Sequence, residues 1–77
     1  MYNQSGMIKS NFEDLRRKKA FEEKRKLTLR TIADETGLSL GTVHRVSSGE
    51  IEKVYLSTID TLCAYFGCTV GEFLNRE

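Results

Sequence analysis

Cysteine and histidine are scarce in this 77-residue chain, which holds Cys63, Cys68 and the single histidine His44. Two cysteines cannot build the disulfide framework typical of small secreted domains, so we expect both to be thiols. The three residues together also fall short of the four ligands that a structural zinc site needs. The sequence therefore predicts no metal site and no cofactor.

Long apolar runs are also missing from the sequence. No run approaches the roughly 20 residues that cross a bilayer, and the N-terminus lacks the apolar centre of a secretory signal. We therefore expect a soluble, cytoplasmic protein with no membrane partner. The opening MYNQSG is typical of an expression scar or a flexible arm. Residues 1–10 are assigned to that arm, and residues 11–77 to one domain.

The residues that an active site requires are sparse too. His44 has no cysteine or serine at the spacing of a nucleophile and its base, no glycine-rich loop is present to cradle phosphate, and the carboxylates are scattered. A chain of this length buries only roughly 60% of the surface that its unfolded form exposes, which disfavours a large cleft. The sequence predicts no enzyme and no small-molecule ligand.

Positive charge is concentrated in the first part of the chain. Residues 1–30 hold nine lysines and arginines against four acids, a balance of +5, and residues 31–77 hold three against seven, a balance of −4. One face that meets a polyanion and another that meets solvent or a sister subunit would explain this asymmetry. A solvated basic helix explains it equally well.

The absence of proline and the spacing of capping residues predict helices throughout, at about 11–25, 29–36, 40–47, 58–66 and 70–75. The one convincing β-type run is IEKVYL. Expected N-terminal caps are Ser10 or Asn11, with Glu13 or Asp14 closing a capping box, then Thr28, Ser39, Ser57 with Asp60, and Thr69 with Glu72. Gly37 and Gly49 are expected to stop the second and third helices.

Apolar residues recur at three- and four-residue spacing in the last four helices and predict one small core. They are Ile32, Ala33, Val43, Val46, Ile59, Leu62, Cys63, Phe66, Val70, Phe73 and Leu74. The first helix is less regular, because RRKKA separates its apolar residues Phe12, Leu15 and Phe21.

The stretch IADETGLSLGTVHRVSSG, from Ile32 to Gly49, holds small and apolar residues at fixed intervals. Only a tight turn remains between its two helices, so they must cross at a steep angle. Ala33 permits close approach, Gly37 supplies a positive φ, and Leu38 fills the inside of the corner. This pattern predicts a helix-turn-helix at about 29–48, with the outer face of its second helix exposed for the major groove.

The chain resembles the Cro and phage-repressor (lambda repressor-like) DNA-binding family over roughly Phe12 to Leu74. The matching motifs are LTLRTIADETGLSLGTVHRVSSG and YLSTIDTLCAYFGCTVGEFL. The resemblance implies an all-α, compact five-helix domain that binds operator DNA, usually as a dimer, and regulates transcription, mostly by repression.

Carried onto this sequence, the family's base-reading positions are Ser39, Leu40, Gly41, His44 and Arg45. Arg45 can donate two hydrogen bonds to guanine, and Leu40 can pack on a thymine methyl. Leu40 and Gly41 depart from the polar residues typical of the family. His44 can donate to a base or a phosphate, or make no critical contact.

Contacts to DNA phosphates are expected from the start of the second helix and from the loop after the third, with a small polar residue near the backbone in the third helix itself. The residues are Thr28, Arg30, Thr31, Thr42, Ser48, Gly49, Lys53 and Tyr55. So few cationic contacts bind weakly in a monomer, which predicts a homodimer. Its interface is expected at Phe73 and Leu74, or at Phe12 and Leu15, although the same residues would serve equally well in the core.

The alternative function is a helix-turn-helix module that binds protein, such as the antitoxin of a toxin pair. It is favoured by a recognition face that is poor in polar readers. Strong salt dependence of binding would distinguish contacts with DNA phosphates from this alternative.

Overall fold

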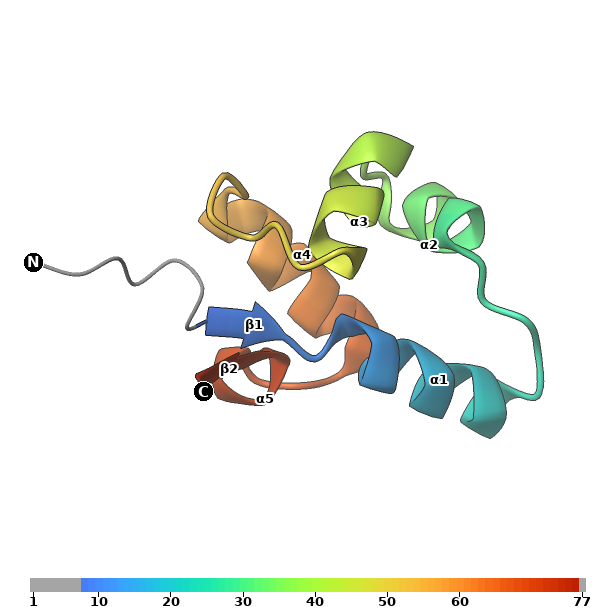
Figure 1. Cartoon of the computed structure of the whole chain (residues 1–77). Helices are drawn as coiled ribbons and strands as arrows, with labels where there is room; N and C mark the ends of the chain where they lie inside the picture. The colour runs from blue at the N-terminus through green and yellow to red at the C-terminus, as the bar shows by residue number, and fades with distance from the viewer. Residues whose placement is uncertain (1–7, 77) are drawn as a thin grey trace, which may run out of the picture.

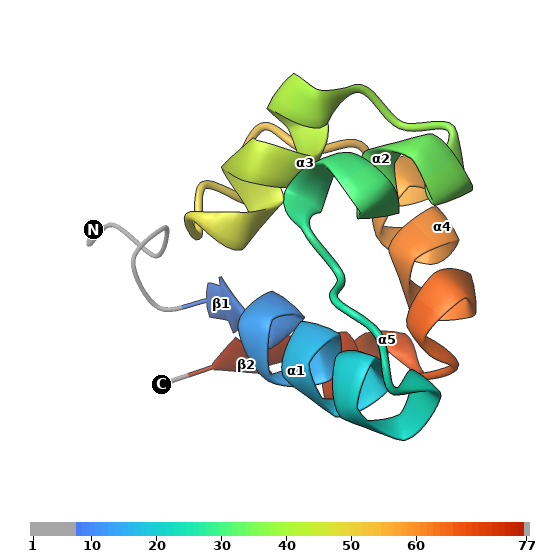
Figure 2. The same cartoon turned by 90° about the vertical axis from the view of Figure 1, so that its right-hand side faces the viewer.

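Five helices and two short strands follow one another in the part of the chain that the computed structural model describes, residues 8–76 (Figure 1). They are β1 (Ile8–Ser10), α1 (Phe12–Glu23), α2 (Leu29–Thr36), α3 (Leu40–Ser47), α4 (Leu56–Phe66), α5 (Val70–Phe73) and β2 (Leu74–Arg76). Figures 1 and 2 show α2 and α3 together on one side of the molecule and α1, α5 and the strands on the other, with α4 running between them. The predicted five-helix fold is confirmed.

Three of the predicted N-terminal caps are present. Thr28 Oγ1 accepts the N–H of Thr31 at 3.0 Å, and Ser39 Oγ accepts the N–H of Thr42 at 3.1 Å. Thr69 forms a full capping box, because its hydroxyl accepts the N–H of Glu72 at 3.1 Å and its own N–H donates to Glu72 Oε1 at 2.8 Å. These bonds set where α2, α3 and α5 begin.

The predicted cap of the first helix is wrong. Asn11 precedes α1 without a capping bond from its side chain, which instead donates to the carbonyl of Glu72 at 2.8 Å. Ser10 belongs to β1, and its hydroxyl donates to the carbonyl of Val46 at 3.2 Å. These polar side chains connect the start of the chain to α3 and α5, so tertiary bonds displaced local ones.

The predicted start of α4 is also wrong. The helix begins at Leu56, with Tyr55 as its cap, so Ser57 lies inside it and no capping box forms there. The Tyr55 carbonyl accepts the N–H groups of Thr58 and Ile59 at 3.0 and 3.2 Å, which starts the helix upstream of the serine. The IEKVYL run forms turns that lead into α4 rather than a strand.

The two strands were missed. They form a two-stranded antiparallel sheet in which Ile8 pairs with Arg76 and Ser10 with Leu74. The fifth helix therefore ends at Phe73, two residues earlier than predicted, since Leu74 is already extended at φ −103° and ψ 137°. Residues 8–10 of the expected arm belong to the folded domain, and residues 1–7 lie outside the described residues.

The core lies where the four C-terminal helices and the start of α1 meet. Its fully or nearly buried apolar residues are Phe12, Leu27, Ile32, Ala33, Val43, Val46, Ile59, Leu62, Cys63 and Phe73. Phe66 is half-buried between Phe12 and Phe73, with ring centroids 5.5 and 6.3 Å away. The predicted inward faces of α2 and α3 are confirmed.

Two apolar residues are exposed, of which only Val70 was expected in the core. Val70 of α5 and Phe21 of α1 are 51% and 84% exposed. Leu27, within KRKLTLR, was not predicted to be buried, but the α1–α2 connection folds inward there and Arg16 donates to the Leu27 carbonyl at 2.7 Å. Thr58 of α4 is the one buried polar residue in the described part of the chain and was also missed.

Both cysteines are thiols, as predicted. Cys63 is buried on α4, and burial is the main reason that its pKa rises to about 11. Cys68 follows α4 and is partly exposed. The N–H of Cys68 donates to the carbonyl of Cys63 at 3.0 Å, in the bonding pattern that closes a helix around a left-handed residue such as Gly67.

The two phenylalanines Phe73 and Phe21 test this core directly, because the first is fully buried and the second is 84% exposed. We expect Phe73→Ala to lower the free energy of unfolding by about 3–5 kcal/mol through lost burial and a cavity. Phe21→Ala should change it by less than about 0.5 kcal/mol. Urea unfolding followed by circular dichroism measures both, and equal effects would contradict the described core.

Candidate nucleic-acid interface

The corner between α2 and α3 consists of Gly37, Leu38 and Ser39, and the backbone of each forms a hydrogen bond. Gly37 adopts φ 80° and donates its N–H to the Ala33 carbonyl at 2.9 Å. The hydroxyl of Thr36 donates to the Ile32 carbonyl at 2.7 Å and accepts the N–H of Leu38 at 3.3 Å. Ser39 then caps α3, so no freely rotating residue separates the two helices.

The inner faces of the two helices are closed by small and branched side chains. Ile32, Val43 and Val46 have no exposed surface, and Ala33 retains only 6%. Alanine lets the helices approach closely, and the branched side chains fix how α3 lies on the core. The face of α3 that carries the valines is therefore committed to the core, and its other face points away from it.

The outer face of α3 carries the predicted base-reading residues. Leu40, Gly41, His44 and Arg45 are all exposed, with Leu40 at 40%. Neither His44 nor Arg45 uses its side chain in a hydrogen bond or ion pair within residues 8–76. The structure thus brings these four residues onto one accessible surface.

Ser39 differs from the other four, although it is exposed as well. Its hydroxyl accepts the N–H of Thr42 and donates to Thr42 Oγ1 at 2.8 Å. A hydroxyl already engaged in capping is less available to a base than an unpaired one. Thr42, assigned to a phosphate, is half-buried and shares the same bond.

The predicted phosphate-contacting residues form two groups. At the start of α2, Arg30 is exposed, and the hydroxyls of Thr28 and Thr31 lie 2.9 Å apart. In the loop between α3 and α4, Ser48, Gly49, Lys53 and Tyr55 are exposed, but the Ser48 hydroxyl donates to the carbonyl of Arg45 at 3.0 Å. The cationic side chains available in these groups are Arg30 and Lys53.

Much of the positive charge in the first part of the chain is paired within the protein. Arg16 contacts Glu13 at 2.6 Å, Lys19 contacts Glu23 at 2.6 Å, and Arg25 contacts both Glu23 and Glu35. The basic run of α1 is thus mostly a salt-bridged helix rather than a site for a polyanion. Lys26, exposed just before α2, has no such pairing in the described residues, and it was not among the phosphate-contacting residues predicted from the sequence.

A polar network fixes α2 against its neighbours. Arg25, in the α1–α2 connection, donates two hydrogen bonds to Glu35 of α2 at 2.6 and 2.8 Å. The hydroxyl of Tyr65 on α4 donates to the same carboxylate at 2.7 Å. These bonds, chiefly those from Arg25, lower the pKa of Glu35 to about 2, whereas burial and then Glu35 raise that of Tyr65 to about 12.

A second polar contact holds α3 to α1. Ser47 at the end of α3 donates to Glu13 Oε2 at 2.9 Å, while Glu13 Oε1 accepts from Arg16. The hydrogen bond from Arg16 is the main reason that the pKa of Glu13 is lowered. With the Glu35 network, this contact fixes both helices of the corner to the rest of the domain.

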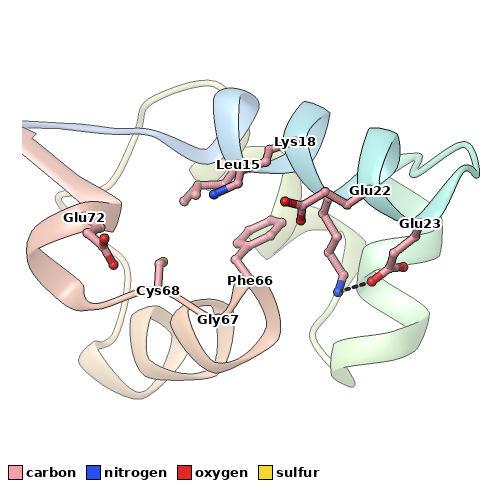
Figure 3. A pocket seen from close by; sticks show the side chains of 9 residues that line it. Leu15, Lys18, Glu22, Glu23, Phe66, Gly67, Cys68 and Glu72 are labelled. Carbon is pink, nitrogen blue, oxygen red and sulfur yellow. Dashed lines mark hydrogen bonds and ion pairs between the residues drawn. The ribbon is translucent and has the colours of Figure 1, made fainter.

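A surface pocket of about 260 Å³ lies away from this face (Figure 3). Its walls come from α1 and from the segment 66–72, and neither α2 nor α3 lines it. Figure 3 shows Phe66 projecting from its segment toward α1 and Glu23 at one end of the pocket. Glu23 forms an ion pair with Lys19, which also lines the pocket. The pocket is therefore separate from the exposed face of α3.

Comparison with known families agrees with this geometry. A family model described as a Cro/C1-type helix-turn-helix DNA-binding domain matches residues 18–77. The chain belongs to this family. The match includes the α2–α3 corner and both later helices, as the sequence predicted. No curated protein and no solved structure was found to match.

Within residues 8–76, no three side chains of the metal-ligating kinds gather at one point. No helix of that part combines the length and hydropathy needed to span a bilayer.

Two glycines test the geometry of the corner, Gly37 within it and Gly41 in the first turn of α3. Gly37→Ala should destabilise the domain by about 1 kcal/mol, because φ 80° is strained for any residue with a Cβ even though no atom lies within 4 Å of that position. Gly41→Ala should stabilise it by about 0.5–1 kcal/mol, since Gly41 is helical, exposed and equally uncrowded. Thermal unfolding of both variants checks the opposite signs.

The Glu35 network predicts a specific pH dependence of stability. Because the pKa of Glu35 falls from 4.5 to about 2 on folding, its contribution is complete above pH 4.5 and disappears as the pH falls toward 2. Glu35→Gln should therefore unfold at lower urea than the parent at pH 7, with a gap that closes on acidification. The exposed Glu22, replaced in the same way, should show no such gap at any pH. A constant gap for Glu35→Gln would contradict the network.

Proposed function

We propose that this Cro/C1-type domain is a sequence-specific transcriptional regulator that inserts α3 into the major groove of operator DNA as a homodimer. Bound at an operator in the cytoplasm, it represses transcription by occupying the site. One observation carries this proposal. The side chains of His44 and Arg45 are exposed and make no hydrogen bond or ion pair within residues 8–76, and they lie on a helix that the three-residue corner and the core hold in place.

Arg45 is the principal reader in this proposal. Its guanidinium is exposed and uncommitted, and a planar fork can donate two hydrogen bonds to guanine O6 and N7. Leu40 adds apolar contact with a thymine methyl, and Gly41 lets the helix lie close to the base edges. His44 supplies a further donor to a base or a phosphate.

Phosphates are held on both sides of α3. The first N–H groups of α2 and the side chains of Thr28, Arg30 and Thr31 act on one side. On the other side, contacts come from the loop residues Ser48, Gly49, Lys53 and Tyr55, with Thr42 near the backbone. Lys26 extends the first group. Because each subunit supplies few cations, two subunits on neighbouring half-sites are needed for useful affinity.

The alternative as a protein-binding module, such as an antitoxin, has one supporting observation. Leu40 and Gly41 are the first two residues of α3 and are both exposed, so the surface has fewer polar readers than operator recognition commonly uses. Absence of binding to any duplex at low salt would favour this alternative.

Selection of bound duplexes from a random pool tests the proposal. We expect an inverted repeat to be enriched, and affinity for it to fall by orders of magnitude between 50 and 200 mM salt. Failure to enrich any sequence, or binding that ignores salt, would contradict operator recognition through phosphates and bases.

Two arginine variants separate base reading from phosphate contact. Arg45→Ala should cost about 1–3 kcal/mol at the selected site and relax preference at one base pair. Arg30→Ala should weaken binding to all sequences alike and reduce the magnitude of the salt slope by about one. Arg17→Ala, which removes an exposed cation of α1, serves as the control and should change neither quantity. Fluorescence anisotropy at several salt concentrations measures all three.

A further inference from the structure

Side chains from the start of the chain hold the C-terminal end of α3. The hydroxyl of Ser10, the last residue of β1, donates to the carbonyl of Val46 at 3.2 Å. Glu13 Oε2, in the first turn of α1, accepts from the hydroxyl of Ser47 at 2.9 Å. Figure 2 shows β1 beneath this end of the helix. Two consecutive residues of α3 are thus bonded to one short segment, residues 10–13, which forms a strap across the domain.

The strap is anchored to the other side of the domain as well. The N–H of Asn11 donates to the carbonyl of Phe73 at 2.7 Å, and the Asn11 side chain donates to the carbonyl of Glu72 at 2.8 Å. Phe12 is buried in the core, and the strand that ends at Ser10 pairs with β2. Because each residue of the strap is bonded or buried, the strap can restrain α3 rather than follow its motion.

The residues that the strap holds directly follow Arg45, the principal reader of the proposed function. Arg45 lies in the last turn of α3, and helix ends fray first because their last carbonyls lack partners within the helix. Here the carbonyls of Arg45 and Val46 accept the N–H groups of Glu50 and Gly49 at 3.0 and 3.1 Å. The Val46 carbonyl also accepts the hydroxyl of Ser10, so the strap completes the bonding of the turn that carries the reader.

A restrained last turn benefits base reading more than phosphate contact. A guanidinium that donates two hydrogen bonds to one guanine must arrive with its plane and its distance set. A frayed turn has to be ordered on binding, and this cost in entropy reduces the affinity for the correct base pair. Attraction between a cation and a phosphate depends mainly on distance, so it tolerates a loose turn better.

The strap precedes residues 18–77, the region that the family model matches, so the match assigns it no role. We propose that Ser10 and Glu13 are positioning residues for DNA reading, which hold the last turn of α3 so that Arg45 meets its base pair in one orientation. The inference rests on the proposed function and names the residues, outside the helix-turn-helix itself, on which its specificity depends.

Two neighbouring variants of the full chain test the proposal. Ser10→Ala and Asn11→Ala each remove one hydrogen bond from a strap side chain to a backbone carbonyl, but only the first of these carbonyls belongs to α3. Ser10→Ala should lower the ratio of the affinities for the selected operator and a random duplex by about tenfold, with the salt slope unchanged. Asn11→Ala should leave the ratio as it is, and Ser10→Thr, which keeps the hydroxyl, should restore it. Fluorescence anisotropy measures each affinity.

Combination with Arg45→Ala shows whether the strap acts through the reader. In that background Ser10→Ala should lower the ratio no further, because the side chain that it positions is gone. Ser47→Ala removes the other bond between the strap and α3 and should repeat the effect of Ser10→Ala in the parent. A loss of equal size with and without Arg45 would overturn the proposal.

Amide hydrogen exchange without DNA measures the restraint itself. In Ser10→Ala the amides of Ser48, Gly49 and Glu50, which close the last turn of α3, should exchange about fivefold faster, while those of α2 keep the rates of the parent. Asn11→Ala should show no such local change. Unchanged exchange at these three amides, or equal acceleration throughout α2 and α3, would overturn the positioning role.

The two assays separate failure of this inference from failure of the proposed function. If Ser10→Ala weakens operator and random duplexes by the same factor, the strap has only a structural role and the proposed function stands. If the parent shows no preference among duplexes, the proposed function fails and takes the reading role of the strap with it. The exchange rates then still decide whether Ser10 restrains α3.

Discussion

Three residues between α2 and α3 govern how the outer helix is presented. Gly37 turns the chain with a positive φ, Leu38 packs inward, and Ser39 caps the next helix, so each is fixed by a bond or by burial. Ile32 and Ala33 on one helix and Val43 and Val46 on the other then leave α3 a single way to lie on the core. The outer face of α3 is exposed because its inner face, with Val43 and Val46, is fully buried against the core.

Polar contacts make this arrangement rigid with respect to the rest of the domain. The carboxylate of Glu35 accepts bonds from Arg25 and Tyr65, which come from the α1–α2 connection and from α4. The carboxylate of Glu13 on α1 accepts a bond from Ser47 at the C-terminal end of α3. Within α1, ion pairs of Arg16 with Glu13 and of Lys19 with Glu23 likewise occupy bases that the sequence shows only as positive charge.

A helix boundary can be predicted from the sequence where the residues that set it lie close together in the chain. Thr28, Gly37 and Ser39 mark the ends of α2 and α3 by short-range bonds, so these boundaries and the exposed face of α3 could be predicted. The sheet could not, because each strand has three residues and its partner lies more than 60 positions away. The burial of Leu27 and the exposure of Val70 depend on how distant segments meet, and periodicity alone does not reveal that.

The central claim is that the outer face of α3, held by the corner, is the surface that meets duplex DNA. Nuclear magnetic resonance of the ¹⁵N-labelled chain, titrated with an operator duplex at low salt, tests it most directly. The account predicts that the largest amide shift changes fall at residues 28–31, 39–45 and 48–55, with little change along α1. Changes concentrated around the pocket between α1 and residues 66–72, with α3 unaffected, would contradict it.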